Sequence, residues 1–133
     1  MGTIQGIAEI VLIVSDVPRS LAFYRDALGL TVISPAEMKG PVFLRVGDEG
    51  AGGPQQIVLV PRPPSVGAPP ADRLQRGLHH IGLEVLPADF QPEWQRLTDL
   101  GFAIRTGEHP FLPVQAFYLD DPDGNEVEIV TRR

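Results

Sequence analysis

An internal repeat limits the folds open to this chain more than any other feature of its sequence. The run EIVLIV from Glu9 matches the run HIGLEV from His80, and a helix-like segment that ends in a glycine follows each. Gly29 comes 20 residues after Glu9, and Gly101 comes 21 residues after His80. A repeat of this length marks two copies of one supersecondary unit. Glu9 and His80 therefore occupy equivalent positions.

Each half of the chain predicts a strand, a helix and three more strands. Short runs rich in β-branched and aromatic residues indicate strands, and apolar residues spaced three or four apart indicate helices. In the first half, the predicted strands are residues 7–14, 30–34, 41–47 and 55–61, and the predicted helix is 18–28. In the second half, the strands are 80–85, 102–106, 115–120 and 125–131, and the helix is 87–100.

This order predicts an α+β fold made of two βαβββ modules in tandem. We expect the modules to form a half-open, cleft-forming barrel of mixed β-sheet with flanking helices. Module 1 covers residues 7–60 and module 2 covers residues 78–132, within a single domain over 1–133. Residues 61–77 hold five of the fourteen prolines and are expected to form a surface linker.

Composition narrows the function classes. A net charge of −6, with only 11 Lys and Arg residues scattered along the chain, disfavours nucleic acid as a partner. No window approaches the ~20 consecutive apolar residues of a membrane span, and no signal peptide is visible, so a cytoplasmic location is expected. The chain has no cysteine, which excludes disulfides, thiolate ligands and a cysteine nucleophile. The expected partner is a small-molecule substrate.

The repeat also predicts a metal site. If the two sheets face one another, four equivalent side chains surround the cleft, and three of these positions hold Glu9, His80 and Glu128. Glu128 comes 48 residues after His80, and the same spacing after Glu9 leads to Ile57. The fourth position is therefore Ile57 or the adjacent Val58. Two carboxylates and an imidazole suit a divalent ion such as Fe(II), Mn(II), Ni(II), Co(II) or Zn(II), whose charge also offsets the cost of burying the carboxylates.

Each of these residues also has a structural explanation. Glu9 can be a solvated strand residue, and an isolated histidine such as His80 is more often a core residue. Glu126 shares a strand face with Glu128. Because Glu126 stands at the start of the strand, next to the turn at 121–124, and Glu128 lies further from that turn, Glu128 is favoured as the ligand. By strand alternation His79 points away from His80, which predicts a structural or edge role.

Three segments of this sequence form a recognisable set: VSDVPRSLAFYRDALGL (14–30), GLHHIGLEV (77–85) and FYLDDPDGNEVEIV (117–130). Together they resemble the vicinal oxygen chelate superfamily, which includes glyoxalase I, extradiol dioxygenases and bleomycin-binding proteins. The resemblance covers about residues 7–131 and implies that His80 and Glu128 stand at metal-ligand positions. Glu9 stands where many members have histidine.

The resemblance implies binding of two neighbouring substrate oxygens to the metal, which stabilises the negative charge that develops on the substrate. Glu9 and Glu128 are the candidate proton acceptors, and Tyr118, a candidate donor, is more typical of a strand core. The apolar fourth position argues against glyoxalase I itself, although Gln56 offers a substitute donor if its side chain faces the cleft. Members of the superfamily usually dimerise, so we expect a homodimer.

Three functions remain open at this point. The first is a metal-dependent lyase, isomerase or ring-cleaving dioxygenase acting on a small oxygenated substrate. The second is a metal-free protein that sequesters a small molecule between apolar and aromatic walls; Phe43 and Phe117 are the candidate walls, together with Gln56, and Trp94 is a weaker one. The third is a non-catalytic remnant in which Glu9 and His80 simply pair.

Overall fold

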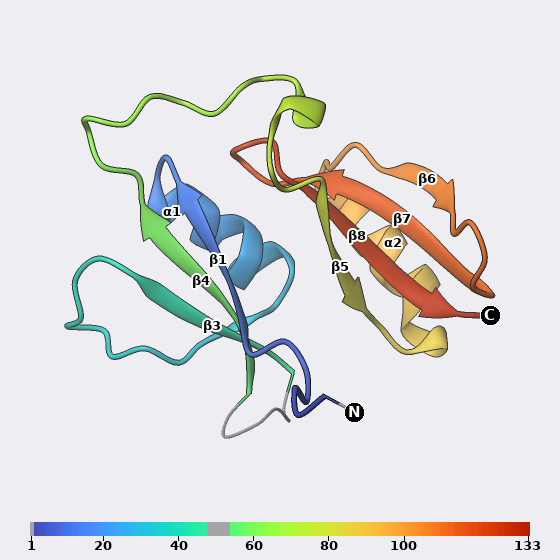
Figure 1. The fold of residues 1–133 in the computed structure, drawn as a ribbon. Coiled ribbons are helices and arrows are strands. Elements are labelled where there is room, and N and C mark those ends of the chain that lie inside the picture. Colours follow the sequence, from blue (N-terminus) through green and yellow to red (C-terminus); the bar gives the residue numbers. More distant parts are fainter. Residues whose placement is uncertain (1, 48–53) are drawn as a thin grey trace. The chain divides into compact units, whose positions relative to one another are not determined.

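Two four-stranded sheets with the same connectivity make up the part of the chain that the computed structural model describes, residues 2–47 and 54–133 (Figure 1). The chain divides into two compact units, Met1–Ala68 and Pro69–Arg133. This division falls within the proline-rich segment 61–77. The predicted α+β class and the βαβββ order of each half are confirmed.

The elements follow one another along the chain in this order: β1 (Glu9–Val14), α1 (Val17–Leu21), η1 (Ala22–Ala27), β2 (Thr31–Val32), β3 (Val42–Gly47), β4 (Gln55–Pro61), η2 (Arg73–Gln75), β5 (His80–Glu84), α2 (Pro87–Asp99), β6 (Arg105–Glu108), β7 (Val114–Asp120) and β8 (Glu126–Arg132). The largest departure from the sequence-based prediction is β6, which begins at Arg105 and not at residue 102.

In both sheets the first strand of the module pairs in parallel with the last. The strand order is β1-β4-β3-β2 in the first sheet and β5-β8-β7-β6 in the second. A parallel pair needs a long crossover connection, and the helix of each module supplies part of it. The pairing therefore brings residues nearly fifty positions apart in the sequence next to each other.

The helix of each module begins and ends within one residue of the predicted positions. The side chain of Asp16 caps the first helix by accepting a hydrogen bond from the backbone N–H of Arg19 at 3.1 Å. The second half of that helix, η1, has π-helical hydrogen bonds. Gly29 (φ 81°) and Gly101 (φ 97°) end the two helical segments in the left-handed conformation that favours glycine.

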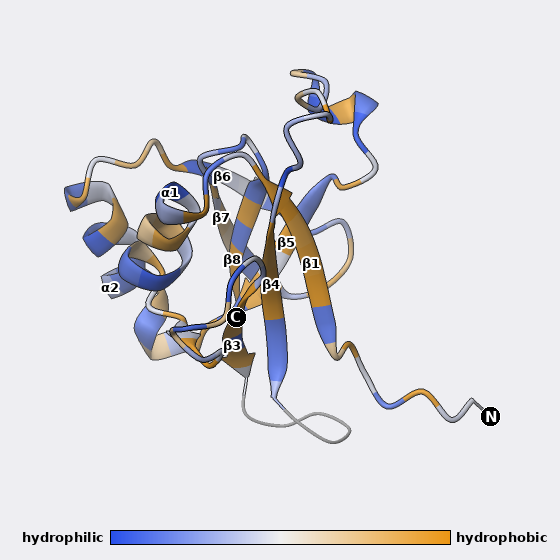
Figure 2. Cartoon of the chain, turned by 90° about the vertical axis from the view of Figure 1, so that its left-hand side faces the viewer, coloured by the Kyte–Doolittle hydropathy of each residue, from blue (hydrophilic) through white to orange (hydrophobic). Residues whose placement is uncertain are grey.

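Each sheet buries one face under its own helix and leaves the other face more open. In the first module Leu12 and Val14 are buried, whereas their neighbours Val11 and Ile13 are 50% and 60% exposed. Figure 2 shows that β1 is hydrophobic along most of its length, so its exposed side is also apolar. In the second module β8 alternates in the same way, but its open side carries carboxylates. Among the described residues no helix is both long and apolar enough to cross a bilayer.

The aromatic cluster beneath α2 generates a stability prediction. Phe117 is fully buried, and its ring centroid lies 5.2 Å from that of Phe90 and 5.3 Å from that of Trp94. Replacing a buried phenylalanine with alanine removes apolar contacts and leaves a cavity, which costs about 3–5 kcal/mol. We expect Phe117→Ala to lower the free energy of unfolding by this amount in a urea titration. Phe111→Ala, at a position 79% exposed, is the matched control and should change it by less than about 0.5 kcal/mol.

Candidate functional site

His80 and Glu128 lie together on the open face of the second sheet. His80 begins β5, and Glu128 lies on the neighbouring strand β8, opposite Gly82. The Nε2 atom of His80 is 3.9 Å from Oε2 of Glu128, and the side chain of Glu128 is only 14% exposed. The parallel pairing of β5 and β8 thus joins two of the three residues that the sequence predicts as metal ligands.

Two glycines make room for Glu128 and for the tyrosine that holds it. The hydroxyl of Tyr118 donates a hydrogen bond to Oε2 of Glu128 at 2.6 Å. A Cβ at Gly82 would lie 3.0 Å from Oε1 of Glu128, and a Cβ at Gly107 would lie 2.6 Å from a ring carbon of Tyr118. Side chains at these two positions would therefore displace the pair.

The hydrogen bond with Glu128 keeps Tyr118 protonated. Mainly through that bond, and also through burial and the negative charges of Glu128 and Glu126, the pKa of Tyr118 rises to about 12. A phenol whose pKa is raised by folding stabilises the fold below its ordinary pKa of about 10, and this contribution is lost as the pH rises towards 12. At neutral pH Tyr118 is therefore protonated, and its hydroxyl donates a hydrogen bond to Glu128.

His79 lies beside His80, although strand alternation predicts that it points away. The Nδ1 atoms of the two rings are 2.8 Å apart, and the ring centroids are 5.0 Å apart. The alternation does not apply because β5 begins at His80, so His79 precedes the strand. Such a contact needs one Nδ1 to donate and the other to accept. When His80 donates from Nδ1, its Nε2 carries the lone pair that a metal ion requires.

Glu126 is the neighbour of His80 on β8, but it belongs to an ionic network. Its Oε2 atom accepts hydrogen bonds from Arg73 Nη1 and from Arg105 Nη2, both at 2.8 Å. Arg105 also binds Asp120 at 2.7 Å, and Arg73 lies 3.4 Å from the same carboxylate. Asp120 and, to a smaller extent, Glu126 raise the pKa of Arg105. The network pairs two guanidinium groups with two carboxylates.

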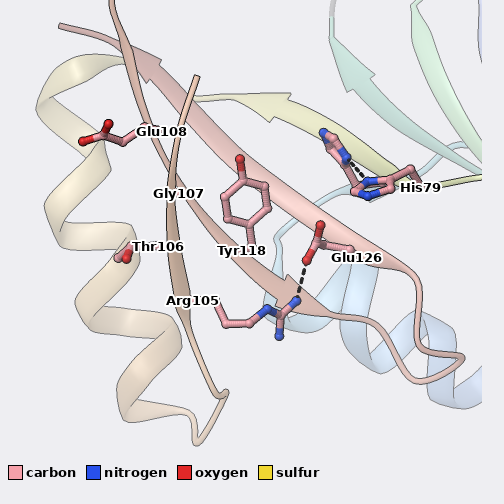
Figure 3. A pocket seen from close by; sticks show the side chains of 8 residues that line it. His79, Arg105, Thr106, Gly107, Glu108, Tyr118 and Glu126 are labelled. Atoms are coloured by element: carbon pink, nitrogen blue, oxygen red, sulfur yellow. Dashed lines mark hydrogen bonds and ion pairs between the residues drawn. The ribbon is translucent and has the colours of Figure 1, made fainter. Parts of the chain in front are cut away.

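His79, His80, Arg105, Tyr118 and Glu126 line a cavity of about 290 Å³, together with residues of the edge strand (Figure 3). Its lining residues all belong to the second unit; they are His79, just before β5, and residues of β5 to β8: His80, Arg105, Thr106, Gly107, Glu108, Tyr118 and Glu126. Figure 3 shows Arg105 reaching Glu126 from the edge strand while Tyr118 projects from the same face of the sheet. A cavity of this size is at the small end of the range for ligand sites.

The first module carries three predicted site residues on one sheet face. Glu9 is exposed and pairs with Gln56, and Phe43 pairs with Val58 two positions further along β4. Paired residues point to the same side of a sheet, so Gln56 and Phe43 share the face of Glu9. The pairing also resolves the fourth position. Gln56 is opposite Glu9, and Glu126 is opposite His80, so Gln56 corresponds to Glu126. Two positions further along each strand, Val58 and not Ile57 corresponds to Glu128.

Phe117 and Trp94 do not line the cavity around His80. Phe117 pairs with Ile129, one position away from Glu128, and therefore lies on the opposite face of the sheet. Phe117 is fully buried beneath α2, and the half-buried Trp94, which is part of α2, packs against it. The structure thus places Phe117 in the core and not in the predicted substrate wall, because the register of β7 turns Tyr118 towards the site.

Sequence reasoning set Tyr118 aside and did not identify Arg73 or Arg105. The turn at 121–124 contained the missing signal for Tyr118, because a hairpin closed at that turn puts Tyr118 opposite Glu128. No comparable signal existed for Arg73, which reaches the site from the segment expected to be a linker.

The donor atoms of His80 and Glu128 fit a shared divalent ion. Atoms that bind one ion at 2.0–2.3 Å lie roughly 3 to 4.5 Å from each other. The separation of 3.9 Å between Nε2 and Oε2 falls within this range. A second group, His79, His80 and Glu126, has donor atoms within 4.8 Å of one another, but two arginines already bind its carboxylate.

The pair of Tyr118 and Glu128 can be tested by titration. We expect Glu128→Gln to lower the pKa of Tyr118 from about 12 towards 10, because the carboxylate no longer holds the phenolic proton. The pKa would be read from the ¹³C chemical shift of the tyrosine ring, with Tyr118→Phe identifying the signal. Glu84→Gln, on the same sheet but with a side chain 69% exposed, is the control and should leave the value unchanged. An unchanged value in Glu128→Gln would contradict the assigned hydrogen bond.

Known proteins share both this sequence pattern and this fold. The family model described as the Glyoxalase/Bleomycin resistance protein/Dioxygenase superfamily matches residues 6–129. A catechol-2,3-dioxygenase of Bacillus subtilis (strain 168) is 30% identical over 124 residues, which are 92% of this chain and 40% of that protein. The chain thus spans well under half the length of this relative.

Solved structures support the same assignment at the level of the fold. A glyoxalase/dioxygenase from Nostoc punctiforme superposes with a TM-score of 0.76 at 19% identity, covering 99% of this chain and 94% of the other. TnmS3, an antibiotic binding protein from Streptomyces sp. CB03234, superposes with a TM-score of 0.66 at 20% identity, covering both chains completely. Because its family model extends over nearly the whole chain, this protein belongs to the glyoxalase/bleomycin resistance protein/dioxygenase superfamily, as its three sequence segments predict.

Proposed function

We propose that this protein is a metal-dependent enzyme that binds a small substrate through two neighbouring oxygen atoms. The observation that carries the proposal is the separation of 3.9 Å between His80 Nε2 and Glu128 Oε2 on the open face of the second sheet. His80 and Glu128 would bind the ion, and Glu9 is the proposed third ligand.

The case for Glu9 comes from the repeat. Glu9 begins β1 as His80 begins β5, and both first strands pair in parallel with the last strand of their module. The side chain of Glu9 is exposed on the face that also carries Gln56. We propose Glu9 as a ligand on this equivalence, and a separate variant below tests it.

The donor set favours certain ions. One imidazole and two carboxylates provide nitrogen and oxygen ligands, and the chain contains no cysteine. Such ligands suit Fe(II) or Mn(II) as well as Zn(II), Co(II) and Ni(II), whereas softer ions prefer sulfur. A bound divalent ion would supply Lewis-acid activation of the substrate oxygens.

The residues around the cavity would divide the remaining tasks. Tyr118 holds the carboxylate of Glu128 in place through its hydroxyl, and its raised pKa keeps it protonated. Glu128 or Glu9 would accept a proton from the substrate while loosely coordinated. The edge strand β6 closes one side of the cavity with Thr106 and Gly107, which limits the size of the substrate.

Within this class we propose ring cleavage of a catechol-like substrate as the first reaction to test. The name of the Bacillus subtilis relative, a catechol-2,3-dioxygenase, supports it, and a cavity of about 290 Å³ suits a single-ring compound. Lyase and isomerase reactions use the same binding of two neighbouring oxygens and are the next to test.

A metal-free binding protein is the second candidate. The exposed apolar residues Val11 and Ile13 and the half-buried Phe43 share one face of the first sheet, which favours contact with an apolar ligand or with another protein chain. TnmS3, whose fold is similar, is an antibiotic binding protein. Tight binding of a small aromatic compound without any metal, and without turnover, would favour this candidate.

We also propose that the protein forms a homodimer. In the described sheets β1, β2, β5 and β6 are edge strands, and β1 has an exposed apolar side. Exposed edges and apolar faces are commonly covered by association. A sedimentation equilibrium mass of one chain at micromolar concentration would contradict the dimer.

Metal binding decides between the two candidate functions. Chelator-free protein should bind one divalent ion per chain, and Glu128→Gln and His80→Ala should each weaken binding at least about tenfold, because each removes a ligand. Glu84→Gln is the control for the loss of one carboxylate from the same sheet and should bind as the wild type does. Isothermal titration with Mn(II), Fe(II) and Zn(II) measures the affinities.

Glu9→Gln tests the third ligand separately, with Glu37→Gln as its control in the first module. A loss similar to that of Glu128→Gln supports Glu9 as a ligand, and an unchanged affinity removes it from the site. Oxygen consumption by the Fe(II)-loaded protein with a catechol then tests ring cleavage. If no ion binds under any loading condition, the metal-dependent function is wrong.

A further inference from the structure

We propose that Arg73 and Arg105 hold Glu126 out of the metal site, so that Glu128 is the carboxylate that His80 uses. This inference rests on the proposed metal function and adds two residues that determine which ligand is selected. Both arginines act through Glu126, so they are positioning residues.

The second sheet offers His80 two neighbouring glutamates. Glu126 is directly opposite His80 in the strand register, and Glu128 lies one residue pair further along, opposite Gly82. Both carboxylates point to the open face, because they are two positions apart on β8. The donor atoms of His79, His80 and Glu126 lie within 4.8 Å of one another, which is a second arrangement able to hold an ion.

Charge separates the two glutamates. Glu126 is 8% exposed and receives two guanidinium groups on one oxygen, each at 2.8 Å. Glu128 accepts a hydrogen bond from the neutral hydroxyl of Tyr118, and its Oε2 atom lies 3.9 Å from Nε2 of His80. A divalent cation at Glu126 would displace, or be repelled by, two positive charges, whereas at Glu128 it would meet a carboxylate that binds no guanidinium group of the described residues.

Both arginines are anchored by contacts other than Glu126. Arg105 forms two bonds with Asp120, at 2.7 and 3.3 Å. Arg73 lies in the short turn η2, which Asp72 caps by accepting a hydrogen bond from the N–H of Leu74. Arg76, at the end of this turn, binds the backbone carbonyls of Pro70 and Asp123 at 2.7 and 3.1 Å. The two cations are therefore held beside Glu126 whether or not an ion binds at His80.

The first test compares the two glutamates in the otherwise unchanged protein. The measured quantity is the dissociation constant for Co(II), read from its visible absorption. We expect Glu126→Gln to change it by less than about threefold and Glu128→Gln to raise it at least about tenfold. An equal loss in both variants would overturn the inference while leaving the metal function intact.

The second test removes the arginines. The variant R73Q/R105Q/E128Q should recover Co(II) binding to within about tenfold of the wild type, because Glu126 becomes free to join His79 and His80. Adding Glu126→Gln to this variant should abolish the recovery. R73K/R105K/E128Q keeps both positive charges and should not recover binding. Absence of recovery in a folded R73Q/R105Q/E128Q protein would overturn the inference.

Controls separate this inference from the fold and from the proposed function. R96Q/R132Q removes the same net charge from α2 and β8, away from Glu126, and should leave Co(II) affinity unchanged. Thermal unfolding checks that each variant is folded; if the triple variant is not, the comparison of Glu126→Gln with Glu128→Gln decides alone. If the wild type binds no Co(II), the proposed function fails. In that case the inference stands only if R73Q/R105Q binds Co(II) and adding Glu126→Gln abolishes this binding. It is overturned if R73Q/R105Q also binds no Co(II).

Discussion

The parallel pairing of the first and last strands of each module is the constraint on which the rest of the structure depends. Because β5 lies beside β8, His80 has Glu126 and Glu128 as neighbours, although more than forty residues separate them in the sequence. The helix between the first two strands covers one face of the sheet, so Glu126 and Glu128, which alternate with buried residues on β8, face the other way. The second sheet uses this open face for charged and polar groups.

Neighbouring acidic groups on this face differ in what neutralises them. Asp120 and Glu126 are held by guanidinium groups, whereas Glu128 is held by a phenol that stays protonated. A carboxylate that accepts its hydrogen bond from a neutral donor keeps its negative charge available for a ligand. In this sheet, the charge of the neighbouring groups therefore determines whether a carboxylate forms an ion pair with arginine or is left to bind a ligand.

Much of the fold follows from local sequence signals, and the site follows from them only in part. The repeat, the helix caps and the capping glycines at 29 and 101 predicted both modules, because these signals act within a few residues. His80 and Glu128 were predicted as partners because the repeat fixes the strand order. Roles that depend on register were less predictable, since a shift of one residue inverts a strand: Phe117 was expected in the substrate wall but is buried, and Tyr118 was set aside as a more typical core residue but faces the site. Arg73 could not be predicted, because an ion pair across 53 residues leaves no periodic trace.

The anchoring of Arg73 divides the segment between the two modules into parts of unequal tolerance. Along the sequence, the boundary between the two compact units falls between Ala68 and Pro69. Arg73 and Arg76 belong to the second unit, because they contact β8 and the turn that precedes it. Chain lengthening or a new terminus is best tolerated where few contacts hold the backbone. Insertions, circular permutation or proteolytic nicking are therefore compatible with residues 63–68, which follow the last backbone hydrogen bond to β1. From Pro70 onwards the same changes would disturb the charged face that surrounds His80.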